Sequence, residues 1–172
     1  MITVNNVYKL FDGKEILHDV SAKFYSGKTN LIIGQSGSGK TVLMKCIVGL
    51  LRPDKGQICY DGRDVTAMTQ AQTKALRNEI GMLFQGSALF DSETVLGNVM
   101  FPLRMFTHDS YAACKKRAEF CLERVNLKGV NDLYPSEISG GMQKRVAIAR
   151  AIALNPKYLF CDEPNSGLDP KT

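Results

Sequence analysis

The sequence predicts an α/β fold with an antiparallel β portion at the N-terminus, a core of parallel strands and an inserted α-helical subdomain. Two runs of alternating apolar and polar residues, 2–9 and 16–24, predict the antiparallel strands, and Asp12-Gly13 between them is a hairpin turn signal. Short apolar runs at 31–33, 80–84 and 158–161 are followed by glycine or a polar residue, which is typical of buried strands that end beside a ligand. An amphipathic run over 109–125 predicts a helix of the inserted subdomain.

A glycine-rich stretch after the first of these apolar runs carries the strongest chemical signal. The segment LIIGQSGSGKT, from Leu31 to Thr41, matches the G-x-x-x-x-G-K-[ST] pattern of a phosphate-binding loop between a strand and a helix. Its glycines let successive backbone N–H groups turn toward an anion, Lys40 adds a charge for the β- and γ-phosphates, and Thr41 offers a hydroxyl to Mg²⁺. A glycine- and serine-rich turn that happens to contain a lysine is the alternative. The flanking strand and helix favour the phosphate-binding loop.

Composition narrows the classes of protein that fit. The chain has 172 residues with 44% apolar content, which suffices for a sizeable core in one domain or most of one. A net charge of +5 is modest and gives only a weak hint of a phosphate-rich or anionic-membrane partner, and a solvated basic surface explains it better. Five cysteines without a C-x-x-C pair argue against a disulfide framework and against a zinc site. No apolar run approaches the roughly 18 residues that a membrane span requires.

Polar side chains follow the later apolar runs. Gln85 comes after the run 80–84, where the strand is expected to emerge beside the nucleotide. Asp162 and Glu163 follow the run 158–161, and two adjacent carboxylates at the end of a buried strand need a cation or a catalytic task. If that strand neighbours the strand of the glycine loop, Mg²⁺ for Asp162 and an attacking water for Glu163 supply both.

The middle of the chain predicts helical structure and two further features. The stretch 86–104 is more apolar than a loop needs, so it forms either a groove for a partner helix, with Leu89, Phe90 and Val99 exposed, or ordinary core. In the helix over 109–125, an apolar stripe runs from Tyr111 to Val125. A further helix is expected over 142–154. Its start at Ser139-Gly140-Gly141 is either a second anion site or a simple helix cap.

Taken together, these segments resemble the nucleotide-binding domain of an ATP-binding cassette (ABC) transporter. GQSGSGKT resembles the Walker A loop, Gln85 the Q-loop, ISGGM (138–142) the signature motif, YLFCDEP (158–164) the Walker B strand and SGLDP (166–170) the D-loop. Within that family, the sequence of 83–104 and of the segments around the signature motif is similar to one member. This member is the ATPase of the bacterial phospholipid transporter for maintenance of outer-membrane lipid asymmetry.

The resemblance implies specific roles. Catalysis falls to Glu163, Gln85 and Lys40, and Mg²⁺ to Thr41, Gln85 and Asp162. ATP binding falls to Phe11, which would stack on the base, and to Gly34, Gln35, Ser36, Gly37, Ser38, Gly39, Lys40, Thr41, Ser139, Gly140, Gly141 and Asp169. From the residues alone, Phe11 fits a base-stacking ring and a core or strand-edge ring equally well.

The resemblance also implies partners, a location and a domain organisation. The chain is expected to hydrolyse ATP as a head-to-tail homodimer on the cytoplasmic face of the bacterial inner membrane, held there by a permease that docks near 86–103. Lipid-shuttle components are further expected partners, and nucleic acid is not. The catalytic core would comprise 1–85 and 156–172, and the helical subdomain 86–155.

Two positions depart from the family pattern. Met142 stands where most members have glutamine, a change shared with the lipid-transport branch. Family members also continue past the D-loop to a switch histidine, whereas this sequence ends at Thr172 with histidines only at 18 and 108. We therefore expect a chain shortened at its C-terminus and poorly active alone. The alternatives are the ATPase of another importer, such as one for amino acids, and a non-transport ABC ATPase of translation or DNA repair.

Overall fold

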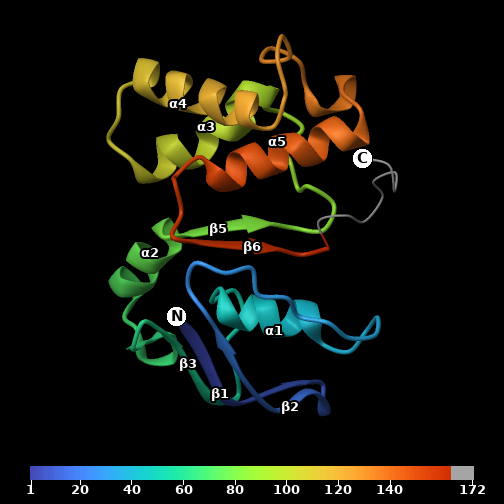
Figure 1. Ribbon diagram of the computed structural model, residues 1–172, viewed down its shortest axis with the longest axis vertical. Coiled ribbons are helices and arrows are strands. Elements are labelled where there is room, and N and C mark those ends of the chain that lie inside the picture. Colours follow the sequence, from blue (N-terminus) through green and yellow to red (C-terminus); the bar gives the residue numbers. More distant parts are fainter. Residues whose placement is uncertain (164–172) are drawn as a thin grey trace. The chain divides into compact units, whose positions relative to one another are not determined.

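The computed structural model describes residues 1–163 and divides into two compact units, Met1–Arg77 and 78–172, the second described as far as Glu163 (Figure 1). The first unit holds a four-stranded antiparallel sheet with a helix on one side. The second holds a pair of parallel strands with three helices. The predicted division into 1–85 with 156–172 and 86–155 stays a prediction.

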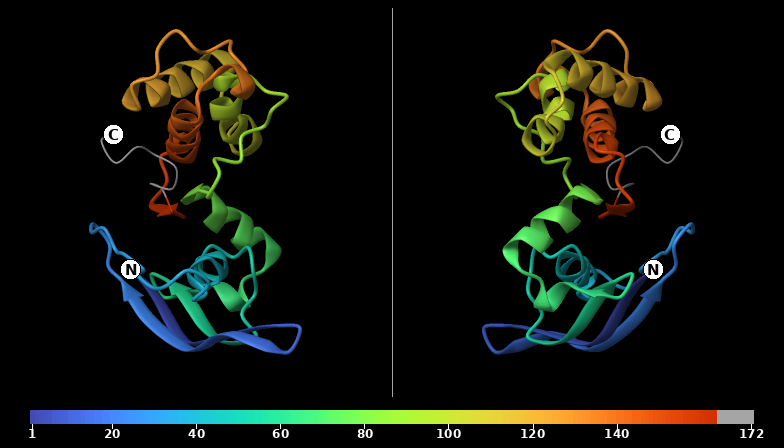
Figure 2. Two further views of the ribbon diagram at one scale, coloured as in Figure 1. Left: turned by 90° about the vertical axis from the view of Figure 1, so that its right-hand side faces the viewer. Right: turned by 90° about the vertical axis from the view of Figure 1, so that its left-hand side faces the viewer.

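The N-terminal hairpin is confirmed. Strands β1 (Ile2–Phe11) and β2 (Lys14–Phe24) pair antiparallel, and β3 (Lys55–Tyr60) and β4 (Arg63–Asp64) complete the order β2-β1-β3-β4. Asp12 and Gly13 join the first two strands with φ values of 49° and 78°, the left-handed pair that a two-residue hairpin turn requires. The side views show this sheet curving beneath α1 (Figure 2).

Helix α1 (Lys40–Ile47) packs into the core of the first unit. Leu43, Met44, Cys46 and Ile47 are buried, so Cys46 is a small residue of this core. The Tyr60 hydroxyl donates to the Ile47 carbonyl at 2.9 Å and so fixes the end of the helix to β3. A 3₁₀ turn, η1 (Val65–Ala67), and the largely exposed helix α2 (Gln70–Asn78) follow.

The predicted strand at 31–33 is wrong in this structure. Residues 29–35 have no strand conformation, and Leu31 and Ile33 are 77% and 84% exposed. An apolar run becomes a strand only when a neighbouring strand bonds its backbone and a packed layer covers its side chains. The sheet of the first unit has the order β2-β1-β3-β4, and the run 31–33 pairs with none of these strands.

In the second unit, β5 (Ile80–Leu83) and β6 (Tyr158–Cys161) pair in parallel, with Ile80 opposite Tyr158 and Leu83 opposite Cys161. Both strands were predicted, but the neighbour of β6 is β5 and not the segment before the glycine loop. Gly81 lets the strands approach the helices closely, because a Cβ there would lie 2.3 Å from the Ala151 carbonyl oxygen.

The helices of this unit are α3 (Val95–Phe106), α4 (Tyr111–Arg124) and α5 (Gly140–Ile152), with a 3₁₀ turn, η2 (Pro135–Glu137), before α5. They share one apolar core that includes Val99, Leu103, Ala118, Leu122 and Val146. Within the predicted stripe of α4, Cys114, Ala118, Cys121 and Leu122 are buried, but Tyr111 is 69% exposed.

The segment 86–104 is largely core rather than groove. Most of it is helix α3, which the Thr94 side chain caps by accepting from the Gly97 N–H at 3.0 Å. Val99, predicted to be exposed for docking, is fully buried, and Leu89 packs against the same core. Apolar residues at 95, 96, 99, 100 and 103 lie on one helix face, and that face turns inward. Phe90 is 41% exposed, so only it keeps the predicted exposure.

Candidate functional site

The glycine loop lies in the first unit, between 34 and the start of α1. The left-handed residues Gly37 and Gly39, with φ values of 77° and 91°, turn the chain sharply into the helix. A Cβ on Gly39 would lie 3.0 Å from both the Ile16 carbonyl oxygen and a Leu17 methyl, so glycine is required there for conformation and for space. All eight predicted loop residues, Gly34 to Thr41, therefore lie together at one helix N-terminus.

Lys40 closes this loop on itself. Its ammonium group donates to the carbonyl oxygens of Gly34 and Gln35 at 2.9 and 2.8 Å. Gly39, the N-cap of α1, has no side chain that could occupy the first amides of the helix. The two carbonyl oxygens hold the Lys40 ammonium group beside the N-terminus of α1, which presents backbone N–H donors. A positive charge next to such donors favours the binding of an anion.

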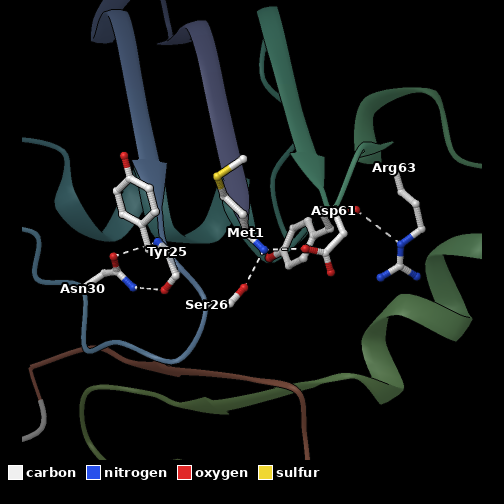
Figure 3. Close-up of polar contacts among 7 residues, drawn as sticks. Met1, Tyr25, Ser26, Asn30, Asp61 and Arg63 are labelled. Carbon is white, nitrogen blue, oxygen red and sulfur yellow. Dashed lines mark hydrogen bonds and ion pairs between the residues drawn. The ribbon is translucent and has the colours of Figure 1, made fainter.

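The chain that leads to the loop is anchored by residues that the sequence did not single out. The Asn30 side chain accepts from the Tyr25 N–H and donates to the Tyr25 carbonyl, both at 2.9 Å (Figure 3). The terminal amine of Met1 contacts Ser26 and Asp61. These bonds close the turn at 25–30 at the edge of the sheet, and an Asn two residues after a Gly-Lys turn is the one signal that predicts such a closure.

Phe11 lies at the end of β1 and is 41% exposed, so the core alternative is wrong. The Lys9 ammonium lies 5.4 Å from the centre of its ring. The exposed face of an aromatic ring at a strand end can stack on a planar group.

In the second unit, the ends of the two parallel strands bring Gln85 and Glu163 together. The Gln85 side-chain nitrogen donates to a carboxylate oxygen of Glu163 at 2.6 Å, although the residues are 78 positions apart in the sequence. Leu83 and Cys161 are opposite each other in register, so the polar residues that follow them emerge at the same edge.

The adjacent residues Asp162 and Glu163 lie in different surroundings. Asp162 is buried, with 9% exposure, and its N–H donates to the Leu83 carbonyl at 2.9 Å. Glu163 is exposed and left-handed, with a φ of 47°, which turns its side chain toward Gln85. Strained backbone of this kind is found where surrounding structure fixes a functional side chain.

Ser139 caps α5, and its hydroxyl accepts from the Met142 N–H at 3.2 Å. The cap reading is thus confirmed. Ser139 and Gly140 are exposed, and no neighbouring atom lies within 4 Å of a Cβ built on Gly140. The start of this 13-residue helix is therefore accessible to a ligand.

The predicted residues thus form three groups. The glycine loop and Phe11 lie in the first unit, whereas Gln85 with Asp162 and Glu163, and Ser139 with its glycines, lie in the second. Asp169 lies outside the described residues. The predicted Mg²⁺ ligands Thr41, Gln85 and Asp162 offer the hard oxygen donors that this ion prefers, since the nitrogen of the Gln85 amide is the atom engaged by Glu163.

Within 1–163, no three or more histidine, cysteine, aspartate and glutamate side chains gather as a metal-binding cluster would. No helix in that range has the length and apolar content needed to cross a membrane.

Comparisons with known proteins agree with this geometry. The family model described as "ABC transporter" matches residues 17–166. The methionine import ATP-binding protein MetN of Carboxydothermus hydrogenoformans is 44% identical over the whole chain, which covers 52% of that protein. The probable ribonucleotide transport ATP-binding protein mkl of Mycobacterium bovis is 40% identical over 98% of the chain and 47% of its own length. The chain therefore spans about half the length of these curated relatives.

Solved structures give the same fold. A dimeric structure of MJ0796, described as a bacterial ABC transporter cassette, superposes with a TM-score of 0.92 and 33% identity over 99% of this chain and 77% of that one. A second structure of MJ0796, a dimer in a post-hydrolysis state bound to ADP and Pi, gives 0.92 at 32% identity, with the same coverage of both chains. The predicted cassette fold is thereby confirmed.

Proposed function

Because this chain belongs to the ABC transporter family, we propose that it is the ATP-binding and ATP-hydrolysing part of a transporter, and that the transporter is an importer of a small solute. The observation that carries the proposal is the 2.6 Å hydrogen bond between Gln85 and Glu163 at the ends of β5 and β6. It places a carboxylate, held by a neutral amide, at the edge where a parallel sheet receives its ligand.

The glycine loop binds the phosphates in this proposal. Backbone N–H groups of the loop at the N-terminus of α1 bind the anion, while Lys40 exchanges its two carbonyl partners for phosphate oxygens. Phe11, which is partly exposed, stacks on the base, and the Lys9 ammonium lies 5.4 Å from the centre of its ring.

Glu163 acts as the general base that orients and deprotonates the attacking water. A carboxylate has two oxygens and about four acceptor positions, so a single bond from Gln85 leaves acceptor capacity for a water. The water attacks the γ-phosphorus in line with the bond to the leaving oxygen, and Lys40 with the loop amides stabilises the charge that spreads over the γ-phosphoryl oxygens. Thr41, Gln85 and Asp162 would hold Mg²⁺, which neutralises charge between the β- and γ-phosphates.

The active form in this proposal is a head-to-tail dimer. The exposed N-terminus of α5, with Ser139, Gly140 and Gly141, contacts the nucleotide bound to the loop of the other copy. The dimer sits on the cytoplasmic face of the inner membrane through a permease. Exposed apolar side chains at Phe90, Met105 and Phe106 are the part of 86–106 that fits such a contact.

For the transported molecule, the relatives named for methionine import and ribonucleotide transport favour a small polar solute over a lipid. Import of an amino acid is therefore the first choice. The second choice is a phospholipid transporter with its lipid-shuttle components. It is supported by the sequence around Gln85 and by Met142 in the signature motif.

Purification of the full-length protein with its permease, followed by reconstitution into vesicles, tests this proposal. ATP hydrolysis should be measured with methionine and other amino acids, with ribonucleotides, and with phospholipid supplied by a shuttle protein. Stimulation by an amino acid is the expected result. Stimulation by phospholipid alone would reverse the order of the two candidates, and a protein that hydrolyses ATP with no associated permease would favour the non-transport class.

A further inference from the structure

The turn directly after Gln85 has an unusual backbone. Gly86, Ser87 and Ala88 are three successive residues with positive φ, at 87°, 64° and 46°. Internal bonds run from the Ser87 N–H to the Phe84 carbonyl at 3.2 Å and from the Ala88 N–H to the Gly86 carbonyl at 2.7 Å. Side chains disfavour this region of backbone space, so two such residues in succession persist only where their surroundings impose the conformation.

Arg150 of α5 holds the turn at 86–88 in this left-handed conformation from one side. Its two terminal guanidinium nitrogens donate separately to the Ser87 and Ala88 carbonyls, at 2.8 and 2.9 Å. The guanidinium also lies 5.7 Å from the centre of the Phe90 ring, and burial lowers the pKa of Arg150 from its ordinary value. A planar fork that engages two successive carbonyls fixes both peptide orientations at once, which a single donor cannot do.

Asn98 of α3 holds the segment after the turn. This fully buried side chain accepts from the Phe90 N–H at 2.8 Å and donates to the Phe90, Glu93 and Thr94 carbonyls at 3.0–3.1 Å. The turn at 86–88 is therefore bonded to α5, and the loop that follows it is bonded to α3. Only Gly86 separates Gln85 from the bonded residue Ser87, so the turn constrains where Gln85 lies.

We propose that Arg150 is a positioning residue: by fixing the left-handed turn at 86–88, it holds the Gln85 amide within hydrogen-bonding reach of Glu163. This inference rests on the proposed function of Glu163 as the base. Arg150 belongs to α5, the helix that Ser139 caps. A movement of α5 would therefore shift the turn through the Arg150 guanidinium, and with it the Gln85–Glu163 pair.

A matched control lies on the neighbouring helix. Arg117 donates to the Ala153 and Ile152 carbonyls at 2.9 and 3.0 Å and lies 5.4 Å from the centre of the Phe120 ring. It thus makes the same kind of contact, but at the C-terminal end of α5 and to no part of the turn. Arg117→Met removes a comparable fork without touching 86–88.

The first measurement is hydrogen exchange on the full-length transporter. Arg150→Met should speed amide exchange over 84–93, whereas Arg117→Met should speed it only near the end of α5. Arg150→Lys, which keeps the charge but lacks the planar fork, should not restore protection. Unchanged exchange over 84–93 in Arg150→Met would overturn the inference, whatever the activity of the variant.

The second measurement is a double-mutant cycle on ATP turnover. Arg150→Met should lower kcat by roughly tenfold to a hundredfold, with an unchanged KM for ATP, since misplacement of a catalytic group by about 1 Å has an effect of that size. In a Gln85→Ala background it should lower kcat no further. Independent, multiplying effects would overturn the claim that Arg150 acts through Gln85.

Other outcomes separate this inference from the proposed function. If Gln85→Ala alone keeps full turnover, the role of Gln85 in hydrolysis fails, and the exchange measurement still decides whether Arg150 holds the turn. Should Arg150→Met not fold, Arg150→Lys replaces it in both measurements with the same opposed outcomes.

Discussion

At the residue scale, the site depends on polar side chains held by a few short contacts. Gln85 and Glu163 meet at 2.6 Å, and Lys40 bridges two loop carbonyls. Gln85 and Glu163 come at the ends of apolar runs and Lys40 ends the glycine loop, so the sequence pattern predicts all three as candidate site residues. Local chemistry sufficed here because strand ends and glycine loops have short-range signals.

The first prediction concerns Glu163. Glu163→Gln should keep the affinity for ATP and lower kcat by about 10² to 10⁴, the usual contribution of a general base, because the amide retains an acceptor for Gln85 but takes no proton. Single-turnover assays on the full-length protein, with Kd for ATP measured in parallel, provide the check. Glu137→Gln is a suitable control, since that carboxylate accepts from the Tyr134 N–H at 2.7 Å in another loop. Turnover at the unmutated rate would remove Glu163 from the mechanism.

The second prediction concerns acid stability of the first unit. Hydrogen bonds from the Leu10 N–H and from Lys9 hold the pKa of Asp54 below its ordinary value. For Asp64, burial raises the pKa, but bonds from Thr66 and Gln57 outweigh it and lower the pKa overall. Both carboxylates thus lose protons more readily in the folded state, and they stabilise it fully only above the unfolded pKa of about 4.

This stabilisation should be lost as the pH falls from about 4 through the folded pKa values. Asp54→Asn should therefore be less stable than the unmutated protein at pH 6, and the difference should shrink at pH 3. Urea unfolding at the two pH values measures it. A difference that stays constant between them would contradict the assignment of Asp54.

At the element scale, the sequence predicted most strands and helices, but it did not predict every helix boundary or every strand pairing. Alternation and Asp12-Gly13 gave the hairpin, and the α4 stripe was correct apart from Tyr111. The bounds of helix α3 were not predicted, since 86–104 was interpreted only as a groove or as core, and Pro102 lies inside the helix, where proline is disfavoured. The run 31–33 failed as a strand because pairing depends on a neighbour, which a local pattern cannot reveal.

Arg150 and Asn98 show the same limit. Arg150 bonds to the carbonyls of Ala88 and Ser87, which are 62 and 63 positions away in the sequence. Asn98 bonds to the loop directly before its own helix, at 90–94. An arginine on a helix and an asparagine in an apolar stretch give no signal of such partners. Only the packing of α5 brings Arg150 to the turn.

The third prediction separates core from docking surface in α3. Val99→Asp places a carboxylate in the fully buried core and should destabilise the second unit by on the order of 3–5 kcal/mol, enough to unfold it. Met105→Asp, at a side chain that is 59% exposed, should change stability by less than about 0.5 kcal/mol and weaken association with the permease. Circular dichroism and co-purification measure the two effects. Unimpaired association of Met105→Asp would place the docking surface elsewhere.

At the scale of the whole molecule, the residues assigned to one ATP site are divided between the two compact units. Lys40 and Phe11 belong to the first, and Gln85, Asp162, Glu163 and Ser139 to the second. The sequence resemblance foresaw the fold of the cassette and its family, and the comparisons confirm both. It pointed to a lipid transporter, whereas the relatives that match are named for methionine import and ribonucleotide transport. In the proposed transporter the transported molecule would contact the permease, so the sequence of the ATPase carries little information about it.

The most direct test of the nucleotide site is a calorimetric titration of ATP into the folded protein and two lysine variants. Lys40→Ala removes charge-assisted bonds worth about 1.5–3 kcal/mol each, so Kd should rise by roughly tenfold or more. Lys28→Ala makes the same change of charge at an exposed turn of the same unit and should leave Kd unchanged. A folded Lys40→Ala protein that binds ATP as tightly as the unmutated chain would contradict the assignment of this loop as the phosphate site.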